Sequence, residues 1–309
     1  MKLVRFHDLS KGIRMGLLEN NKVYDLTTIN ASLFSSFQSM LDCSHSVKLS
    51  IEEMVLRELQ EYNGNCQEKL PSFSYSKFEN PSPNPSYVRL KIPHEPPEVW
   101  GCGVTYSRSR RAREGETVVK GIYDRIYDAI RPEIFFKATS SRCVGPNEPI
   151  CLRSDSKWMV PEPELAFFLG KNHEIVGYTV GNDVSARDVE RENPLYLPQA
   201  KIFQGCCALG PTIATQETIK DPKNLKIVCT IRRNGEIAFK DETNTSQLKR
   251  SLDELVEYIC RDNLVSPGTA VLTGTGIIPP DDFTLKDKDI VEIEIENIGV
   301  LRNPVLQLN

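Results

Sequence analysis

The chain has 309 residues, of which 39% are hydrophobic and 26% charged, and this composition excludes wholesale disorder and fibrous proteins. Its length predicts one large domain of catalytic size with a smaller companion. The net charge is −4 and Lys and Arg form no long cluster, so we expect no nucleic-acid partner. No apolar run approaches the roughly 20 residues of a membrane span, so we expect no membrane partner either.

Cysteine usage indicates the compartment. Nine cysteines are present without Cys-x-x-Cys spacing, and the first residues lack the apolar stretch of a signal peptide. We therefore expect a cytoplasmic protein with reduced thiols. In this interpretation the adjacent Cys206 and Cys207 are packing residues, neither metal ligands nor a disulfide.

The first part of the chain predicts a small domain that ends in a proline-rich stretch. Ser50 and Glu53 form the pattern of a capping box and predict a helix with Val55 on its apolar face. Seven prolines between positions 71 and 97 break regular structure and mark a boundary. We expect a small N-terminal α+β domain over residues 1–75, a linker over 76–97 and a catalytic domain over 98–309.

The second part predicts mostly strands. Apolar residues recur at helical spacing between positions 119 and 130, and Pro132 ends that helix. Segments 165–169 and 175–180 predict a hairpin, and segments 225–231 and 291–295 alternate as half-buried strands do. Ser251 caps one further helix. This pattern favours a β-rich α+β fold over a doubly wound sheet, and no glycine-rich phosphate-binding motif is present.

Three carboxylates gather at one end of the predicted hairpin. Glu162 and Glu164 are two residues apart, so an extended chain points them to the same face. With the turn centred near residue 172, position 162 faces position 181 or 182, which brings Asp183 to the same end. Three carboxylates without His or Cys suit Mg²⁺, with Mn²⁺ as the alternative. The competing interpretation is a set of solvated acids at strand ends.

These residues belong to a longer pattern that resembles the fumarylacetoacetate hydrolase superfamily. The resemblance covers roughly residues 98–309 and implies a rolled mixed β-sheet catalytic domain that forms a homodimer or homotetramer. It also implies that Glu162, Glu164 and Asp183 bind a divalent metal. The matching segments are Glu162 to Leu165, Gly181 to Asp188, Lys201, Leu209 to Pro211, Leu272 to Gly276 and Glu294 to Gly299.

Within that superfamily the sequence is more similar to the 2-keto-3-deoxy-D-arabinonate dehydratase branch than to the hydrolases. The hydrolases use a His in a segment resembling Asn-Tyr-x-x-His, and Ser109 stands at that position here. The branch resemblance implies dehydration of a 2-keto-3-deoxy sugar acid, with Glu133 and Lys201 as proton-transfer residues. It is carried by Glu98 to Gly101, Arg131 to Thr139, Arg142 to Gly145, Arg153 to Ser156 and Asn193 to Lys201.

The residue types fit that chemistry. A 2-oxo acid chelates a metal through its carboxylate and ketone oxygens, and the cation acidifies the C3 protons. Glu133 precedes three apolar residues that raise the pKa of a carboxyl group. Lys201 holds the substrate carboxylate or transfers a proton. Further substrate-binding candidates are Thr275, which resembles a carboxylate donor of the family, together with Tyr106, Arg142, Arg108 and Lys137.

Two alternatives stay open. One is a hydrolase or decarboxylase of an acylpyruvate-like 2-oxo acid that uses a base other than His. The other is a non-catalytic sugar-acid binding protein that kept the metal site, although such a protein needs neither Glu133 nor Lys201 as a proton shuttle. The polar segment 107–121 is a candidate lid, and a lid that excludes water suits an elimination better than a hydrolysis.

Overall fold

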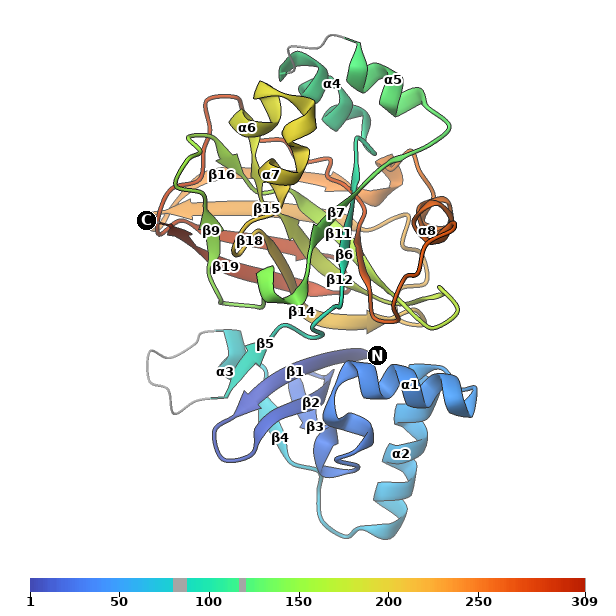
Figure 1. Ribbon diagram of the computed structural model, residues 1–309. Coiled ribbons are helices and arrows are strands. Elements are labelled where there is room, and N and C mark those ends of the chain that lie inside the picture. The colour runs from blue at the N-terminus through green and yellow to red at the C-terminus, as the bar shows by residue number, and fades with distance from the viewer. Residues whose placement is uncertain (80–87, 117–120, 309) are drawn as a thin grey trace.

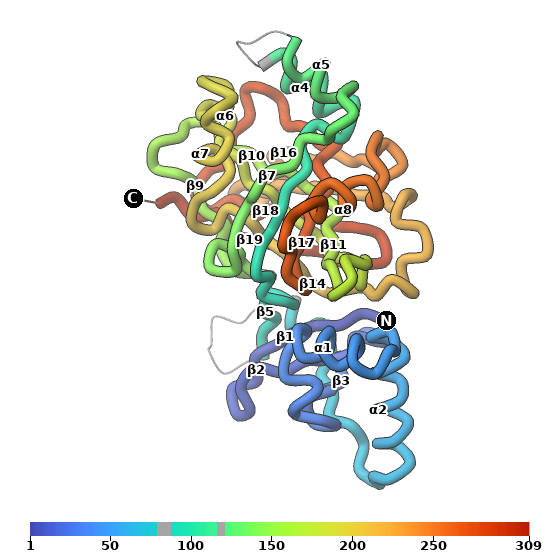
Figure 2. Tube along the Cα trace, turned by 45° about the vertical axis from the view of Figure 1, so that its right-hand side comes forward, coloured from blue at the N-terminus to red at the C-terminus, as the bar shows by residue number. Residues whose placement is uncertain are grey.

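A computed structural model describes residues 1–79, 88–116 and 121–308 (Figure 1). The N-terminal part forms the lower lobe in Figures 1 and 2. Its helix α2 begins with the predicted capping box, because the Ser50 side chain accepts from Glu53 N and the Glu53 side chain accepts from Ser50 N. The elements of this lobe are β1 (Lys2–Asp8), β2 (Gly12–Glu19), β3 (Lys22–Asp25), α1 (Phe37–Val47), α2 (Ile51–Asn65), β4 (Ser72–Ser74), α3 (Ser76–Glu79) and β5 (Arg89–Lys91), with 3-10 turns at Leu26–Thr28 and Leu33–Ser35.

The sheet of this lobe continues into the rest of the molecule. Strand β1 pairs with β14, with Leu3 opposite Ile213. Strand β5 comes from the proline-rich stretch and pairs with β1. Residues 80–87 of the expected linker lie outside the described residues. The division of the chain into a small domain, a linker and a catalytic domain stays a prediction.

The main sheet carries the predicted hairpin at its centre. Within the described residues its strand order is β4-β3-β2-β1-β14-β12-β11-β17-β6-β7, with β5 beside β1 and β8 beside β14. Every residue of β11 and β14 is buried, as expected for strands covered on both faces. The remaining strands of this sheet are β6 (Val99–Gly103), β7 (Glu133–Ala138), β8 (Cys143–Val144), β11 (Pro163–Leu169), β12 (Ile175–Asp183), β14 (Cys207–Thr215) and β17 (Ala270–Leu272).

A second sheet packs against β11, β12 and β14 and has the order β16-β15-β18-β19-β9. Its strands β15 and β18 alternate as predicted, with Ile227, Ile231 and Ile293 buried in the core. The two packed sheets confirm the β-rich α+β fold with a rolled mixed sheet. The strands are β9 (Ile150–Leu152), β15 (Lys226–Arg233), β16 (Glu236–Asn244), β18 (Ile290–Ile295) and β19 (Gly299–Gln307), and β10 (Met159–Val160) pairs separately with β13 (Ser185–Ala186).

Short helices surround the sheets, and α4 and α5 lie at the end opposite the N-terminal lobe (Figures 1 and 2). Helix α8 is capped as predicted, because Ser251 Oγ accepts from Glu254 N at 3.1 Å. The helix expected over 119–130 is described from residue 122, and residues 117–120, which also belong to the candidate lid, lie outside the described residues. The helices are α4 (Ser107–Glu116), α5 (Ile122–Asp128), α6 (Arg187–Glu192), α7 (Leu197–Lys201) and α8 (Leu252–Cys260), with 3-10 turns at Ser140–Arg142, Pro194–Tyr196 and Thr245–Gln247.

Two further observations concern the compartment and partners. In the ranges that the structure describes, no helix has the length and apolar character needed to cross a membrane. The nine cysteines are free thiols, and Cys206 and Cys207 are both buried in the core.

Candidate active site

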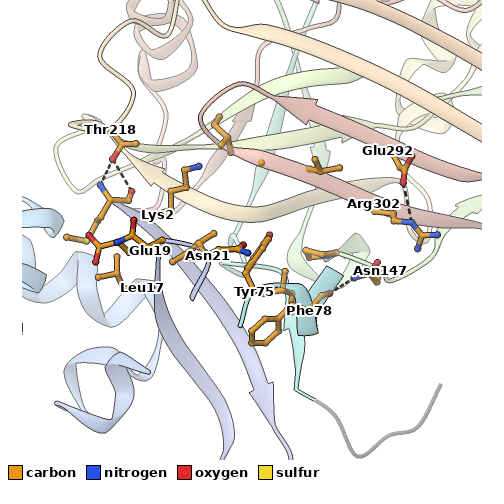
Figure 3. Close-up of a pocket in the computed structure, with 18 residues that line it drawn as sticks. Lys2, Leu17, Glu19, Asn21, Tyr75, Phe78, Asn147, Thr218, Glu292 and Arg302 are labelled. Atoms are coloured by element: carbon orange, nitrogen blue, oxygen red, sulfur yellow. Dashed lines mark hydrogen bonds and ion pairs between the residues drawn. The ribbon is translucent and has the colours of Figure 1, made fainter. Parts of the chain in front are cut away.

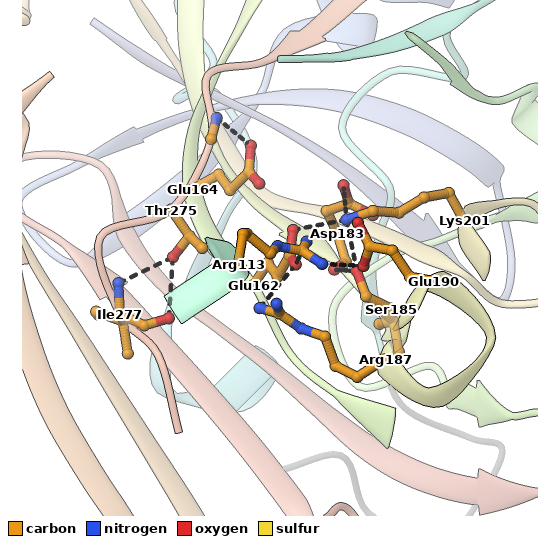
Figure 4. A network of polar contacts seen from close by, with 12 residues as sticks. Arg113, Glu162, Glu164, Asp183, Ser185, Arg187, Glu190, Lys201, Thr275 and Ile277 are labelled. Atoms are coloured by element: carbon orange, nitrogen blue, oxygen red, sulfur yellow. Dashed lines mark hydrogen bonds and ion pairs between the residues drawn. The ribbon is translucent and has the colours of Figure 1, made fainter. Parts of the chain in front are cut away.

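Glu162, Glu164 and Asp183 converge at one end of the β11–β12 hairpin, as the sequence predicted (Figure 4). Asp183 N donates to Glu162 O at 3.0 Å, so position 162 faces 183 and not 181 or 182. The difference has a local cause. Leu169 pairs with Ile175 and Phe168 pairs with Gly177, so one residue of β12 is left over in a bulge and every later partner moves by one position.

The three carboxylates form a buried cluster and not a set of solvated acids. One oxygen from each lies within 4.8 Å of the others, and all three residues are at most 5% exposed. Burial, and then the charges of Asp183 and Glu162, raise the pKa of Glu164 well above its usual range. Gly274 N donates to Glu164 Oε2 at 2.6 Å. A donor set made of carboxylate oxygens fits a hard divalent cation, and Mg²⁺ is the cofactor that this set favours.

Lys201 lies against this cluster from the C-terminal end of α7. Its ammonium donates to Glu162 Oε2 at 2.7 Å, to Asp183 Oδ2 at 3.0 Å and to Ser185 Oγ at 2.7 Å. Burial alone would lower the pKa of Lys201, but the charges of Asp183 and Glu162 outweigh it and the pKa is raised. In this arrangement Lys201 is a paired cation, and its expected role in holding the substrate carboxylate or transferring a proton stays a prediction.

Two arginines complete the positive charge around Glu162. Arg113 Nη2 donates to Glu162 Oε1 at 2.9 Å, and Arg187 Nη2 lies 3.2 Å from the same oxygen. Arg113 also pairs with Glu190 of α6. Burial would raise the pKa of Glu162, but Lys201, Arg113 and Arg187 together lower it.

Sequence analysis did not single out Arg113 or Glu190. Arg113 lies in a run of charged residues that is typical of a solvated helix. One signal was present, because Ser109 and Arg113 are four residues apart and therefore share a face of α4. Both side chains are less than 8% exposed, so α4 turns a polar face toward the carboxylates.

Glu162 of the cluster lines a small cavity of about 20 Å³, which is room for about one water molecule. Thr275 lines this cavity, and its hydroxyl also accepts from Ile277 N at 3.1 Å as part of its own turn. The cavity is lined by Cys102, Gly103, Val104, Ser109, Arg113, Tyr123, Glu133, Phe135, Glu162, Glu190, Leu197, Lys201, Gly274 and Thr275.

Four of the substrate-binding candidates are not among these lining residues. Tyr106 is fully buried, Arg142 donates to Thr139 Oγ1 at 2.7 Å, and Arg108 pairs with Asp241 at 2.6 Å. Lys137 lies behind the cluster and contacts Asp183 Oδ1 at 2.5 Å. Of the predicted site residues, Glu133, Glu162, Lys201 and Thr275 line the cavity. Glu164 and Asp183 lie in the carboxylate cluster with Glu162, and the other four candidates do not line the cavity.

Glu133 begins β7 and faces the cavity. Burial, and then the charge of Glu190, raise the pKa of Glu133 to about 7, which agrees with the proton-transfer role expected for it. Gly103 is opposite Glu133 in β6, and a Cβ atom there would lie 2.4 Å from Glu133 Oε2. The glycine therefore makes room for the carboxyl group.

Histidine does not supply a base here. Among the described residues no histidine lines the cavity, whereas Ser109 does. His94 packs against Phe37 and Phe168, and its Nε2 lies 3.1 Å from Gly268 O. Burial lowers the pKa of His94 to about 4, so this ring is a neutral core residue.

A larger cavity of about 740 Å³ lies elsewhere, between the N-terminal lobe and the second sheet (Figure 3). Several of its polar groups already have protein partners, since Arg302 pairs with Glu292 at 3.5 Å and Asn147 donates to Phe78 O at 3.4 Å. None of the site residues predicted from the sequence lines it. The reacting groups are therefore confined to the small cavity.

The fold and the acidic cluster define a member of a known family. Residues 99–306 match the family described as fumarylacetoacetate (FAA) hydrolase C-terminal. The chain belongs to the fumarylacetoacetate hydrolase family.

Three known proteins are particularly similar to this chain. The 2-dehydro-3-deoxy-D-arabinonate dehydratase of Saccharolobus solfataricus is 52% identical over 222 residues, which are 71% of this chain and 74% of that protein. A probable 2-keto-3-deoxyxylonate dehydratase of Haloferax volcanii is 51% identical over 214 residues, 69% of this chain and 74% of that protein. A structure of 2-keto-3-deoxy-D-arabinonate dehydratase complexed with magnesium and 2,5-dioxopentanoate is 40% identical, covers 100% of both chains and has a TM-score of 0.79.

Replacement of Asp183 by Asn should weaken metal binding. The change keeps the shape of the side chain but removes its charge, and we expect the dissociation constant for Mn²⁺, measured by titration calorimetry, to rise by about 100-fold, since even supporting residues around a metal contribute about 10- to 100-fold. Asp289→Asn is the matched control, because Asp289 is an equally buried carboxylate that pairs with Arg233. Wild-type affinity in Asp183→Asn would rule out this site.

The raised pKa of Glu133 also predicts how stability depends on pH. With a folded pKa of about 7 and an ordinary pKa near 4.5 when unfolded, the folded metal-free chain binds the extra proton between these values. The stability contributed by Glu133 therefore falls as pH rises through this window. Between pH 5 and pH 8 the free energy of unfolding of the wild type, measured with urea, should fall by on the order of 2 kcal/mol relative to that of Glu133→Gln. Parallel pH dependences of the two proteins would contradict the raised pKa.

Proposed function

We propose that this chain is a Mg²⁺-dependent dehydratase of 2-keto-3-deoxy sugar acids. The favoured substrate is a 2-keto-3-deoxypentonate such as 2-keto-3-deoxy-D-arabinonate, and the product is 2,5-dioxopentanoate. The observation that carries the proposal is a carboxyl group with a pKa of about 7, Glu133, in the same small cavity as Glu162 of the buried carboxylate triad. The dehydratase relatives and the structure with magnesium and 2,5-dioxopentanoate support the same reaction.

Glu162, Glu164 and Asp183 would hold the metal. A divalent cation at these oxygens supplies Lewis-acid polarisation of the 2-oxo group, which acidifies the neighbouring C3 protons. Glu133 then accepts a C3 proton, the C4–OH bond breaks, and the proton held by Glu133 leaves with the hydroxyl group as water. Transfer of a proton from C5 to C3 then gives an enol between C4 and C5, and transfer of the enol hydroxyl proton to C4 converts C5 into the aldehyde carbon. The net change is the loss of one water molecule.

The small size of the cavity fits an elimination. Ser109 and Arg113 of α4 and Tyr123 of α5 form its cover, and excluding water suppresses competing hydrolysis. A space for about one water does not admit a five-carbon sugar acid. Substrate entry therefore requires α4 to move aside and to carry Arg113 away from Glu162, in agreement with the lid expected over this segment.

The assembly and the compartment belong to this proposal as well. A homodimer or homotetramer is what the family resemblance implies for the chain. The nine free thiols are consistent with the reducing cytoplasm. The substrate partner is a small 2-oxo acid.

Substitution of Glu133 by Gln tests the chemical step. The amide keeps size and hydrogen bonding but cannot accept a proton, so kcat should fall by about 10²- to 10⁴-fold while KM changes little. Glu174→Gln is the matched control, because Glu174 is exposed at the far end of the hairpin. Ser109→His should not improve turnover, since no acid partner orients a ring at that position. A nearly silent Glu133→Gln would refute the assignment of the base.

Proton exchange separates enolisation from elimination. A 2-oxo acid with no hydroxyl at C4, such as 2-oxopentanoate, can lose its C3 proton but cannot lose water. In D₂O with Mg²⁺ the chain should therefore catalyse deuterium incorporation at C3, detected by NMR, and Glu133→Gln should not. Products with an added water and a cleaved carbon–carbon bond, from any 2-oxo acid, would favour the hydrolase alternative instead.

A further inference from the structure

Lys137 is a buried ammonium whose hydrogen bonds all go to protein groups of the site. Its side chain is 0% exposed. The Nζ atom contacts Asp183 Oδ1 at 2.5 Å and donates to Val184 O at 2.9 Å and to Lys201 O at 2.5 Å. Two hydrogen bonds to carbonyls and one ion pair with Asp183 surround the ammonium, and Lys137 does not line the small cavity.

The three acceptors belong to segments that are far apart in sequence. Asp183 ends β12, Val184 connects it to β13, and the Lys201 carbonyl ends α7. Lys137 itself comes from β7. One ammonium therefore ties the strand of a proposed metal ligand, the residue after it and the helix of the proposed catalytic lysine to a fourth element.

Lys137 and Lys201 contact different oxygens of Asp183. It occupies Oδ1, whereas Oδ2 lies 3.0 Å from Lys201 Nζ. The same Lys201 ammonium is 2.7 Å from Glu162 Oε2. Asp183 therefore presents one oxygen, Oδ2, to the side that it shares with Glu162, and Lys137 prevents the carboxylate from rotating away.

Strand β7 connects this contact to the proton-transfer group. Residues 133, 135 and 137 point to the same face of an extended strand. Glu133 lines the cavity, the Phe135 ring lies 5.3 Å from Lys201 Nζ, and Lys137 holds Asp183. Strand β7 thus carries both Glu133, the proposed base, and the lysine that contacts Asp183, so it sets the distance between the base and this proposed metal ligand.

Stability alone does not account for a lysine here. A buried ion pair gains little over well-packed apolar side chains, because desolvation offsets the attraction between the charges. A methionine of similar length would fill the same space. The contacts of Lys137 instead converge on the groups whose arrangement decides metal binding and proton transfer.

We propose that Lys137 is a positioning residue that holds Asp183 as a one-oxygen metal ligand and fixes the backbone of Lys201. This inference rests on the proposed metal site and adds to it a residue that touches neither the metal nor the substrate. Loss of such a supporting contact typically weakens metal binding by about 10- to 100-fold.

The test measures Mn²⁺ binding by the full chain without substrate, by titration calorimetry and by the Mn²⁺ EPR signal. We compare Lys137→Met, Lys137→Arg and the wild type. Lys137→Met should weaken Mn²⁺ binding by about 10- to 100-fold. Lys137→Arg keeps the charge but replaces the three donors of an ammonium with the planar donors of a guanidinium. Its affinity for Mn²⁺ should lie between that of the wild type and that of Lys137→Met. If Lys137→Met does not fold, Lys137→Arg alone should still bind Mn²⁺ more weakly than the wild type.

Arg233→Met is the matched control, because Arg233 also pairs with a buried carboxylate, Asp289, at 2.8 Å, and neither residue lines the small cavity. It should lower the melting temperature and leave the Mn²⁺ dissociation constant unchanged. At saturating Mg²⁺, Lys137→Met should also lower kcat more than it raises KM, because the backbone of Lys201 is no longer held.

The outcomes separate this inference from the proposed function. If Lys137→Met or Lys137→Arg folds and binds Mn²⁺ as tightly as the wild type, or more tightly, Lys137 has no positioning role although the dehydratase proposal stands. If the wild type binds Mn²⁺ and loses affinity on these changes but does not dehydrate sugar acids, the positioning role stands and the proposed reaction fails.

Discussion

The site depends on keeping three like charges together away from water. Carboxylates within 4.8 Å of one another repel strongly in a buried setting, and the chain offsets this repulsion with buried cations. Lys137 and Lys201 take the two oxygens of Asp183, and Arg113 and Arg187 share one oxygen of Glu162. Glu164 instead accepts from Gly274 N and is the carboxyl group whose pKa rises. A divalent cation would supply the missing positive charge.

The fold supplies the rigidity that this arrangement needs. Strands β11 and β12 lie at the centre of the main sheet and are covered by the second sheet. Backbone pairing therefore fixes the carboxylates on one side, while β7, α6 and α7 bring the cations and Glu133. Helix α4 contacts the site through a charged side chain, because Arg113 pairs with Glu162 and Glu190 (Figure 4). A cover held by ion pairs can open at lower cost than one held by a packed apolar core.

Local patterns in the sequence were sufficient to predict part of this site. Spacing within one hairpin predicted that Glu162, Glu164 and Asp183 would meet, and the family resemblance pointed to Glu133, Lys201 and Thr275. The predicted register of the hairpin was wrong, because the bulge in β12 cannot be seen in the alternation of apolar and polar residues. Arg113 and Glu190 were missed because their partners come from other elements, and a charged helix looks solvated until its tertiary position is known. Tyr106 and Arg142 were expected to bind the substrate, but neither of them lines the cavity.

The central claim is that this buried acidic site uses a divalent cation to remove water from a 2-keto-3-deoxy sugar acid. The most direct measurement is the mass of the product formed from 2-keto-3-deoxy-D-arabinonate, with Mg²⁺ and again after chelation with EDTA. The account predicts 2,5-dioxopentanoate, one water lighter than the substrate, formed with Mg²⁺ and not after chelation. A product that has gained water or lost CO₂, or the same rate of dehydration after chelation, would contradict it.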